Sequence, residues 1–413
     1  MKMKKIVSIV FVLSLCAACI YFLLYRQEPK VKLEDKSGNE DTIPFEHEEE
    51  EEINPKKEED SKNEVQWEKD VMDMIAKMSI KEKVGQLFIV EPEEMIGNQE
   101  AEVVGAIPKE ALEQYPVGGI IYFAHNLISK EQIKDMIQIS QSHSKIPLFI
   151  SVDEEGGRVA RVSKLLEIPE IPSMKEIGES KDSKEAYEVG QRIGTYLKEL
   201  GFNLNFAPIA DLITNAENQV IGDRSFGEDV GLVSEMVAEV IKGLQEQDIS
   251  ATLKHFPGHG DTKEDSHLGY AYSYRTLEEL REAELIPFQG GIDEGVDFVM
   301  TGHISLPSIL EDDTPASLSK EITVLLREEL GFEGVIVTDA LNMGAIQNHY
   351  TAKEAAIAAL EAGADIILMP SDFEEAFHGV MEAVESGIIS EERIEKSVRR
   401  ILRIKMKRGL DLW

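Results

Sequence analysis

From Trp67 to Trp413 the sequence alternates between short apolar runs rich in β-branched residues and longer stretches in which apolar residues recur with helical spacing. This alternation is typical of repeated βα units around a parallel sheet, and it constrains the fold more than any other feature. Eight strands in 347 residues predict an α/β fold, a single (β/α)₈ barrel of the TIM type with insertions. The eight apolar runs are Gln86–Val90, Gly119–Phe123, Leu148–Val152, Asn203–Ala207, Ala251–Lys254, Phe298–Thr301, Val335–Val337 and Asp365–Met369. The candidate helices between them include Ser183–Leu200, Val230–Gln247, Leu277–Gly290 and Ala352–Ala362.

Polar residues follow five consecutive runs, from the third to the seventh. In order they are Asp153, Asp211, His255, His303 and Asp339. A barrel of this type carries its active site on the loops at the carboxyl ends of its strands. A single acidic residue after a strand can equally cap the next helix. Five polar residues on one rim nevertheless predict that the active site lies there.

Residues 1–26 form a separate segment. Three lysines precede Ile6–Tyr25, a run of 20 residues without a charge, which is long enough as a helix to span a bilayer. Apolar Ile20–Leu24 follow the only plausible Ala-Ala cleavage pair, and this disfavours a cleaved signal peptide. We therefore expect an uncleaved transmembrane helix, with the rest of the chain on the extracytoplasmic side by the positive-inside tendency.

The two cysteines leave a second interpretation of this segment open. Cys16-Ala17-Ala18-Cys19 resembles a lipobox, although Cys16 stands where a branched aliphatic residue is expected. A lipidated cysteine would then replace the helix as the membrane attachment. Because Cys16 and Cys19 are the only cysteines, the remaining chain has neither a disulfide framework nor thiolate metal sites.

The segment 27–66 is strongly acidic. It carries 15 acidic residues and six lysines, including the run Glu48–Glu52. A segment so charged and so poor in large apolar residues predicts a disordered linker to the barrel at 67–413, although a tail that binds cations or a partner is an alternative. The whole chain has 43 Lys and Arg against 78 Asp and Glu, a formal net charge of −35, which argues against nucleic acid as a partner.

The densest group of reactive residue types runs from Lys254 to His267 and includes three His and two Asp in 14 residues. Its Pro and Gly residues exclude a regular helix, so we expect a shaped and plausibly mobile catalytic loop. Lys254 and His255, at the strand end, can point at a ligand. Asp265 and His267 project to the same side of an extended segment, so the carboxylate can orient the imidazole and raise its pKa, as a general acid/base requires.

Two further stretches supply acidic and basic groups. Asp339 ends a buried strand and is placed rigidly enough to act as a carboxylate nucleophile, with a helix cap as the alternative role. Asp153 and Arg161 flank two glycines, and Arg224 lies in a turn after the fourth strand. Asp and Arg together suit a polyhydroxylated ligand, whereas a structural ion pair is the alternative.

A zinc site on the same rim is a competing interpretation of the histidines. His255, His259, His267 and His303, with nearby carboxylates, include the residue types that bind zinc. The spacing disfavours it, because no His pair stands at one or four residues on a regular element. We therefore expect no metal or other cofactor, and we expect His259, between two glycines, to pack the loop.

These motifs resemble those of the bacterial β-N-acetylglucosaminidases of glycoside hydrolase family three. The resemblance extends from near Trp67 to the C-terminus, and the run Lys254–His267 is its most specific part. It implies a retaining exo-glycosidase that acts on terminal, non-reducing N-acetylglucosamine, as found in peptidoglycan fragments and muropeptides. We expect the chain to act without the second α/β sandwich domain that some members carry after the barrel, and Glu154 stands where many relatives have Gln.

The resemblance also implies a role for each matching residue. Asp339 corresponds to the nucleophile, His267 to the general acid/base and Asp265 to its partner. The positions implied to hold the sugar and its acetamido group are Asp153, Arg161, Arg224, Lys254 and His255. Three rivals to hydrolysis by this route stay open: phosphorolysis of the same glycosides, a metal-dependent hydrolase, and a wall-binding protein without catalysis.

Overall fold

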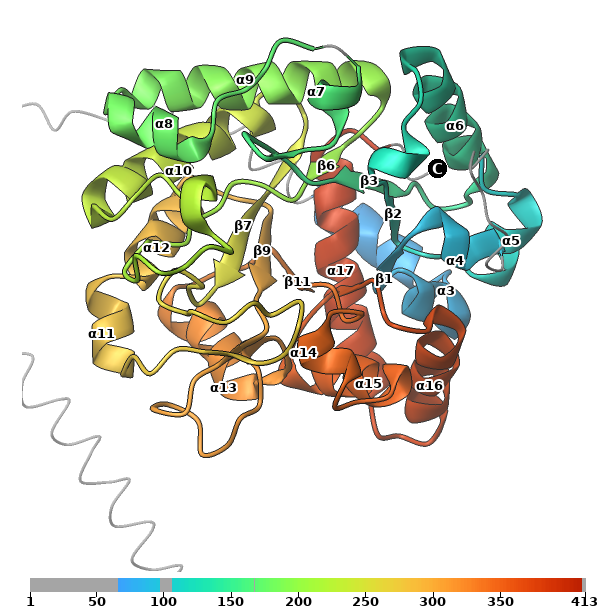
Figure 1. Ribbon diagram of the computed structural model, residues 1–413. Helices are drawn as coiled ribbons and strands as arrows, with labels where there is room; N and C mark the ends of the chain where they lie inside the picture. The colour runs from blue at the N-terminus through green and yellow to red at the C-terminus, as the bar shows by residue number, and fades with distance from the viewer. Residues whose placement is uncertain (1–65, 97–105, 167, 411–413) are drawn as a thin grey trace, which may run out of the picture. The chain divides into compact units, whose positions relative to one another are not determined.

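The structure is a computed structural model that describes residues 66–96, 106–166 and 168–410, all of which belong to one compact unit (Figure 1). The expected membrane segment 1–26, and the expected linker 27–66 except for its last residue, lie outside the described residues, so both remain predictions. None of the helices in the described ranges combines the length and the apolar character that a membrane span needs.

Eight strands, each parallel to its neighbours, form the central sheet. They are β1 (Phe88–Val90), β2 (Gly119–Ile121), β3 (Phe149–Val152), β6 (Leu204–Asn205), β7 (Ser250–Phe256), β9 (Phe298–Thr301), β11 (Val335–Thr338) and β12 (Ile367–Leu368). The sheet order is β11-β9-β7-β6-β3-β2-β1-β12, and a parallel bridge between Val337 and Ile366 joins its two ends. The prediction of an α/β fold with a closed parallel barrel is confirmed.

Each of the eight predicted apolar runs overlaps one barrel strand, but the strands differ from the runs in length. β6 covers only two residues of the run Asn203–Ala207. Pro208 follows this run, and because it has no N–H it cannot donate to a neighbouring strand. β7 is longer than its run and reaches Phe256, so Lys254 and His255 belong to the strand itself rather than to the loop after it.

Helices surround the barrel (Figure 1). They are α3 (Ile80–Gly85), α4 (Pro92–Ile96), α5 (Lys109–Gln114), α6 (Lys130–His143), α7 (Val162–Leu165), α8 (Met174–Ser180), α9 (Ser183–Leu200), α10 (Val230–Gln245), α11 (Leu277–Glu282), α12 (Leu285–Asp293), α13 (Lys320–Val324), α14 (Gly344–Gln347), α15 (Ala352–Ala362), α16 (Phe373–Glu385) and α17 (Glu391–Lys407). Several begin with a capping box, for example Ser79 with Glu82 before α3 and Thr351 with Glu354 at α15.

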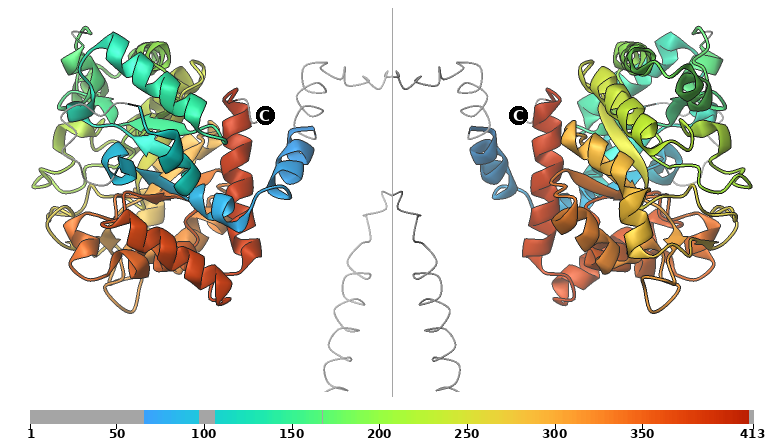
Figure 2. Two further views of the ribbon diagram at one scale, coloured as in Figure 1. Left: turned by 90° about the vertical axis from the view of Figure 1, so that its right-hand side faces the viewer. Right: turned by 90° about the vertical axis from the view of Figure 1, so that its left-hand side faces the viewer.

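Helices α9, α10 and α12 lie beside one another on the outside of the barrel, as the right-hand view of Figure 2 shows. α9 has the predicted bounds, from the Asp182 N-cap to the left-handed Gly201. Close packing requires small residues here. A Cβ on Gly190 would lie only 2.4 Å from the Val240 carbonyl oxygen of α10.

The predicted helix Leu277–Gly290 is wrong as a single element, because the chain forms two helices, α11 and α12, with a break at Ala283. Ala283 has φ −138° and ψ −78°, outside the helical region. Pro287 explains the break. Its ring would clash with the carbonyl of residue 283 in a continuous helix, whereas it is tolerated in the first turn of a new one.

Ion pairs and hydrogen bonds join the end of α17 and the residue after it to the amino ends of the strands. Asp297, which precedes β9, contacts Lys407 at 2.8 Å and Arg408 at 2.5 Å. Lys405 is fully buried and donates to the Gln86 side chain at 2.6 Å. Burial lowers the pKa of Lys405 well below its usual value. These groups lie at the end of the barrel that conventionally serves stability, opposite the rim described next.

Candidate active site

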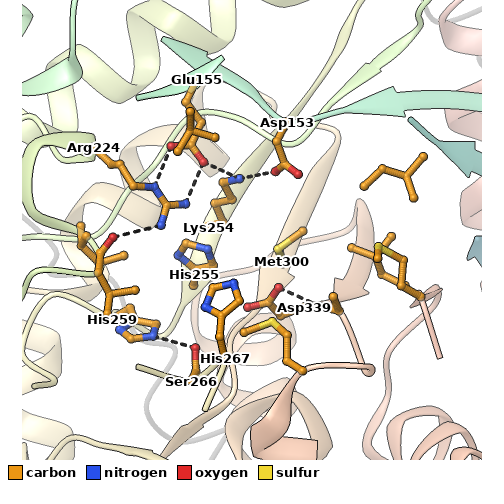
Figure 3. A pocket seen from close by; sticks show the side chains of 18 of the residues that line it. Asp153, Glu155, Arg224, Lys254, His255, His259, Ser266, His267, Met300 and Asp339 are labelled. Atoms are coloured by element: carbon orange, nitrogen blue, oxygen red, sulfur yellow. Dashed lines mark hydrogen bonds and ion pairs between the residues drawn. The ribbon is translucent and has the colours of Figure 1, made fainter. Parts of the chain in front are cut away.

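A pocket of about 310 Å³ opens at the carboxyl ends of the barrel strands (Figure 3). Its volume is at the low end of the ~300–1,000 Å³ typical of small-molecule sites. Among the residues that line it are seven of the eight predicted site residues: Asp153, Arg161, Arg224, Lys254, His255, His267 and Asp339. The eighth, Asp265, contacts His267 directly. Five separate segments of the chain therefore converge on one small hollow.

Asp339 follows β11 immediately, and its backbone N–H donates to the Thr301 carbonyl at 2.9 Å, so the sheet pairing fixes its position. The Asp339 Oδ1 atom accepts from the Ala340 N–H at 2.8 Å. Burial raises the pKa of the Asp339 carboxyl, but the nearby His303 and His255 imidazoles and this hydrogen bond lower it, and the net pKa lies below the usual value. Asp339 is therefore a rigid carboxylate that is ionised at neutral pH.

His267 and Asp265 form a pair on the loop after β7. The His267 Nδ1 lies 2.7 Å from the Asp265 Oδ1, and the same oxygen accepts from the His267 N–H at 2.9 Å. Burial raises the pKa of Asp265, but the hydrogen bonds from His267 lower it by more than burial raises it. The carboxyl therefore has a net pKa below its usual value. With Nδ1 held in this way, Nε2 is the nitrogen available to a ligand. Both His267 and Asp339 line the pocket (Figure 3).

The loop that carries His267 is attached to the segment that follows Asp339. The Gly344 N–H donates to the His267 carbonyl at 3.1 Å, and the Ala345 N–H donates to the Ser266 carbonyl at 3.2 Å. These two donors lie in the first turn of α14, where backbone N–H groups have no partner within the helix. The carboxylate and the imidazole thus keep their relative position through two backbone hydrogen bonds.

A buried network of four charged side chains lines another wall. The Lys254 Nζ contacts Asp153 Oδ1 and Glu155 Oε1, each at 2.7 Å, while Arg224 donates to both Glu155 oxygens at 2.8 Å. Burial raises the pKa of Glu155, but Arg224 and Lys254 lower it more strongly, to well below its usual range. Burial lowers the pKa of Arg224, and Glu155 raises it above its usual value. The net pKa shifts of Glu155 and Arg224 both favour the charged forms.

A charged network of this kind can hold a ring of hydroxyl groups without a cofactor. The carboxylates accept hydrogen bonds, and the ammonium and guanidinium groups donate them. Arg161 adds another donor. Its guanidinium lies 5.9 Å from the centre of the Phe123 ring, and its buried Nε has no hydrogen-bond partner among the described residues. A buried donor without a partner is costly, so this atom is suited to a bound ligand.

Comparison with known proteins supplies the family. The profile described as "Glycosyl hydrolase family 3 N terminal domain" matches residues 79–404, which is most of the chain. The chain belongs to glycosyl hydrolase family 3. The family expected from the loop motif and the strand-end aspartate is therefore confirmed.

Three of the similar proteins are named for their activity on hexosamine sugars. Beta-hexosaminidase A of Pseudoalteromonas piscicida is 34% identical over 326 residues, which cover 72% of this chain and 54% of that protein. Beta-hexosaminidase of Stenotrophomonas maltophilia strain K279a is 35% identical over 279 residues, 66% of this chain and 82% of that protein. A solved family 3 β-N-acetylglucosaminidase from Paenibacillus sp. str. FPU-7 is 39% identical with a TM-score of 0.74, covering 81% of this chain and 63% of that chain. The chain thus spans about half the length of the first of these relatives.

Glu155 is a pocket residue of this family 3 chain that the sequence motif did not single out. Glu154, which attracted attention as a departure from Gln, lies on the opposite side and is fully buried. It accepts from three backbone N–H groups at 2.6–3.0 Å, those of residues 161–163 at the start of α7, and from the Tyr196 hydroxyl at 2.7 Å. The sequence did contain a signal for Glu155, because side chains alternate in direction along an extended chain. Residues 153 and 155 therefore project to one side and residue 154 to the other.

Asp211 was expected on the rim but was not assigned a role. It is fully buried and accepts from the backbone N–H groups of His255 and His259, at 3.1 and 2.7 Å, through Oδ1. Its Oδ2 lies 2.8 Å from the His255 Nδ1. Burial raises the pKa of Asp211, but His255 and His259 lower it to below the usual value. Asp211 therefore positions His255 and the start of the catalytic loop rather than touching the pocket.

His259 supports the loop from within. It is buried between the hydroxyls of Thr262 and Ser266, which lie 2.7 and 3.2 Å from its two ring nitrogens. Burial is the main cause that lowers the pKa of His259 to about 4, so the ring is neutral near pH 7. The expectation that His259 packs the loop agrees with this placement, although its ring also lines the pocket.

His303 occupies a similar position behind the nucleophile candidate. Its ring nitrogens lie 2.8 Å from the Ser317 hydroxyl and 2.9 Å from the Ala340 carbonyl. Burial lowers the pKa of His303 below its usual value. The four histidines considered for zinc therefore have separate protein partners, and the described ranges contain no group of three or more His, Cys, Asp or Glu arranged to hold a metal ion.

Proposed function

We propose that this chain is a retaining exo-β-N-acetylglucosaminidase that hydrolyses terminal, non-reducing N-acetylglucosamine from glycans derived from peptidoglycan. The observation that carries the proposal is a pocket in which the ionised Asp339 carboxylate and the imidazole of His267, backed by Asp265, line the same small space. The names of the similar proteins support hexosamine as the sugar.

The first step forms a covalent glycosyl-aspartate. Asp339 attacks the anomeric carbon as the bond from that carbon to the leaving oxygen breaks, and the proton on His267 Nε2 passes to that oxygen. Asp265 holds the other ring nitrogen and stabilises the protonated imidazole before the transfer. An imidazole with its own carboxylate here takes the place of the acid carboxyl that most retaining glycosidases use.

The second step returns the enzyme to its starting state. Neutral His267 accepts a proton from water at Nε2 while the water oxygen bonds to the anomeric carbon, and Asp339 leaves as a carboxylate. Two displacements at one carbon retain the configuration, so the first product formed is the β anomer. The backbone hydrogen bonds from α14 to the loop keep the two groups in register through both steps.

The charged wall binds the sugar in this proposal. Asp153 and Lys254 bind ring hydroxyls, and Arg161 uses its unpaired Nε for a further oxygen of the same sugar. Arg224 is largely buried in its ion pair with Glu155, so its main role is to hold Glu155 in place rather than to bind the ligand. A pocket of about 310 Å³ suits one terminal sugar, which accounts for exo rather than internal cleavage.

The test is hydrolysis of aryl N-acetylglucosaminide with the matching glucoside as control. The proposal predicts release from the first substrate at a rate at least about tenfold above the second, since the acetamido group adds contacts worth that much. Proton NMR of the fresh product is expected to show the β anomer. An initial α anomer, or activity that requires added phosphate or is lost with a chelator, would contradict hydrolysis by this route.

Membrane attachment is also part of the proposal, with the barrel outside the cytoplasm. It rests on the uncharged run Ile6–Tyr25 and the preceding lysines. Fractionation of cells that express the full chain is expected to place it in the membrane. Mass spectrometry of the chain recovered from the membrane separates the two attachments, since an unmodified N-terminal segment indicates a helix and a lipid on Cys16 or Cys19 indicates a lipid anchor. Recovery of the unmodified full-length chain in the cytoplasmic fraction would contradict the proposal.

A further inference from the structure

The stretch directly after His267 exposes large apolar side chains. Among the described residues, the two most exposed large hydrophobic side chains are Leu268 and Tyr274, with 79% and 70% of their surface accessible. Isolated exposed apolar residues are common, but a contiguous group marks a binding surface. Both lie in one segment of seven residues that begins next to the proposed acid/base.

Alternation places three tyrosines of this segment on one side. Ala271 and Ser273 are buried, whereas Tyr270, Tyr272 and Tyr274 keep part of their surface exposed. β8 (Ala271–Tyr272) pairs with β10 (Ile304–Ser305), and this pairing keeps the segment extended. We call Tyr270, Tyr272 and Tyr274 the tyrosine platform.

The rings of the platform are arranged as a row. The Tyr272 and Tyr274 rings are nearly parallel, with an interplanar angle of 14° and centroids 6.2 Å apart. Tyr270 stacks on the ring of His349 at 4.3 Å and meets the Tyr272 ring edge-on at 6.2 Å. These contacts immobilise the rings before any ligand arrives, which reduces the entropy lost on binding.

The platform is attached to the catalytic pair by the chain itself. Two residues separate His267 from Tyr270, so their Cα atoms, three steps apart along the chain, are at most about 10 Å apart. In Figure 1 the chain between β7 and α11 passes close to α14, and Asn348 at the end of α14 donates to the Leu268 carbonyl at 3.5 Å. His349, which backs the platform, follows directly. One helix turn therefore supports both the acid/base loop and the platform.

We propose that the tyrosine platform binds the sugar ring of the leaving group, next to the pocket that holds the terminal sugar. This inference rests on the proposed function, because His267 gives its proton to the leaving oxygen and the leaving group must therefore lie on the His267 side. A pyranose ring has apolar C–H faces and a polar edge. Tyrosine offers a flat apolar ring with a hydroxyl at its tip, which matches both parts.

The experiment compares leaving groups with and without a ring. N-Acetylglucosaminyl fluoride has a leaving group that cannot contact the platform. The disaccharides N-acetylglucosaminyl-N-acetylglucosamine and N-acetylglucosaminyl-N-acetylmuramic acid each carry a sugar ring there. The quantity measured is the ratio of kcat/KM on each disaccharide to kcat/KM on the fluoride. The protein is the full chain, as wild type, Tyr274→Ala, Tyr274→Phe and the control Tyr187→Ala, whose ring lies on α9 outside the barrel.

The proposal predicts that Tyr274→Ala lowers this ratio roughly three- to tenfold on at least one disaccharide, from the usual size of a ring contact. Tyr274→Phe restores the ratio, because the flat ring remains, and Tyr187→Ala leaves it at the wild-type value. The disaccharide that loses more identifies the preferred leaving sugar. An unchanged ratio on both disaccharides for Tyr274→Ala overturns the platform while leaving the proposed function intact. If the wild-type chain releases no N-acetylglucosamine from any of the three substrates, the proposed function itself is wrong, and the platform inference is rejected with it.

Discussion

Buried His259 gives the catalytic loop a pH dependence of stability that can be calculated. Its pKa is about 4 in the folded protein, against 6.5 for an ordinary histidine, because burial disfavours the charged ring. Between these two values the unfolded chain binds a proton that the folded chain does not. The free energy of unfolding therefore falls as the pH falls, by about 1.4 kcal/mol for each pH unit below 6.5.

The expected size follows from that slope. At pH 5 the loss due to His259 alone is about 2 kcal/mol, and near pH 4 it levels off at about 3 kcal/mol. pH 5 is the better place to measure, since it lies above the range in which most carboxyl groups titrate. The same protonation disturbs the contacts of the ring with Thr262 and Ser266, the residue before His267.

Urea unfolding of the wild type and of His259→Gln at pH 7.5 and pH 5 measures this contribution. The glutamine keeps polar atoms in the site but does not titrate, so the wild type is expected to lose about 2 kcal/mol more than the variant over this range. The control is His378→Gln, which replaces an exposed histidine of α16. It is expected to change with pH as the wild type does. Equal losses in the wild type and in His259→Gln would refute the reasoning.

Three further predictions concern the pocket. Glu155→Gln leaves Arg224 and Lys254 without their shared carboxylate, and urea unfolding is expected to show a loss of about 3–5 kcal/mol; a loss below about 1 kcal/mol would contradict the coupling. Gly344→Ala places a Cβ 2.7 Å from the His267 carbonyl oxygen. The displaced loop is expected to lower kcat about 10²-fold with folding retained by circular dichroism, and unchanged kcat would refute this role. His267→Ala is expected to lower turnover far more on a disaccharide than on N-acetylglucosaminyl fluoride, because fluoride leaves without a proton; equal losses on the two substrates argue against a proton donor.

The local pattern of apolar residues in the sequence predicted most of the fold. The eight strands follow from apolar runs, since strands buried on both faces of a parallel barrel are apolar along their whole length. The break inside Leu277–Gly290 was missed because the apolar spacing continues through it. Pro287 was the signal, and its steric effect on residue 283 decides where the second helix starts.

Site residues were predictable from the sequence where a single residue follows a strand. They were less predictable where the residues in contact are far apart in the sequence. Asp339 and the pair Asp265–His267 lie in short motifs, and the residue types within each motif were sufficient to predict a role. The contact of Glu155 with Arg224, 69 residues later, forms only when distant parts of the chain come together in the barrel. No local pattern contains that contact.

The buried supports of the site illustrate the same limit. Asp211 accepts from the backbone N–H groups of His255 in β7 and of His259 in the loop after it, 44 and 48 residues later. His303 reaches a carbonyl 37 residues away. A spacing in the sequence identifies the residue types, but the closure of the barrel decides which of them meet.

The central claim is that the Asp339 carboxylate forms a covalent bond with the sugar. A 5-fluoro-N-acetylglucosaminyl fluoride slows both displacements but keeps a good leaving group for the first, so the intermediate accumulates. Mass spectrometry of peptides from the inactivated protein is expected to find the added sugar on Asp339, and none in Asp339→Asn. A sugar attached to another residue, or steady turnover of natural substrate by Asp339→Asn, would contradict the account.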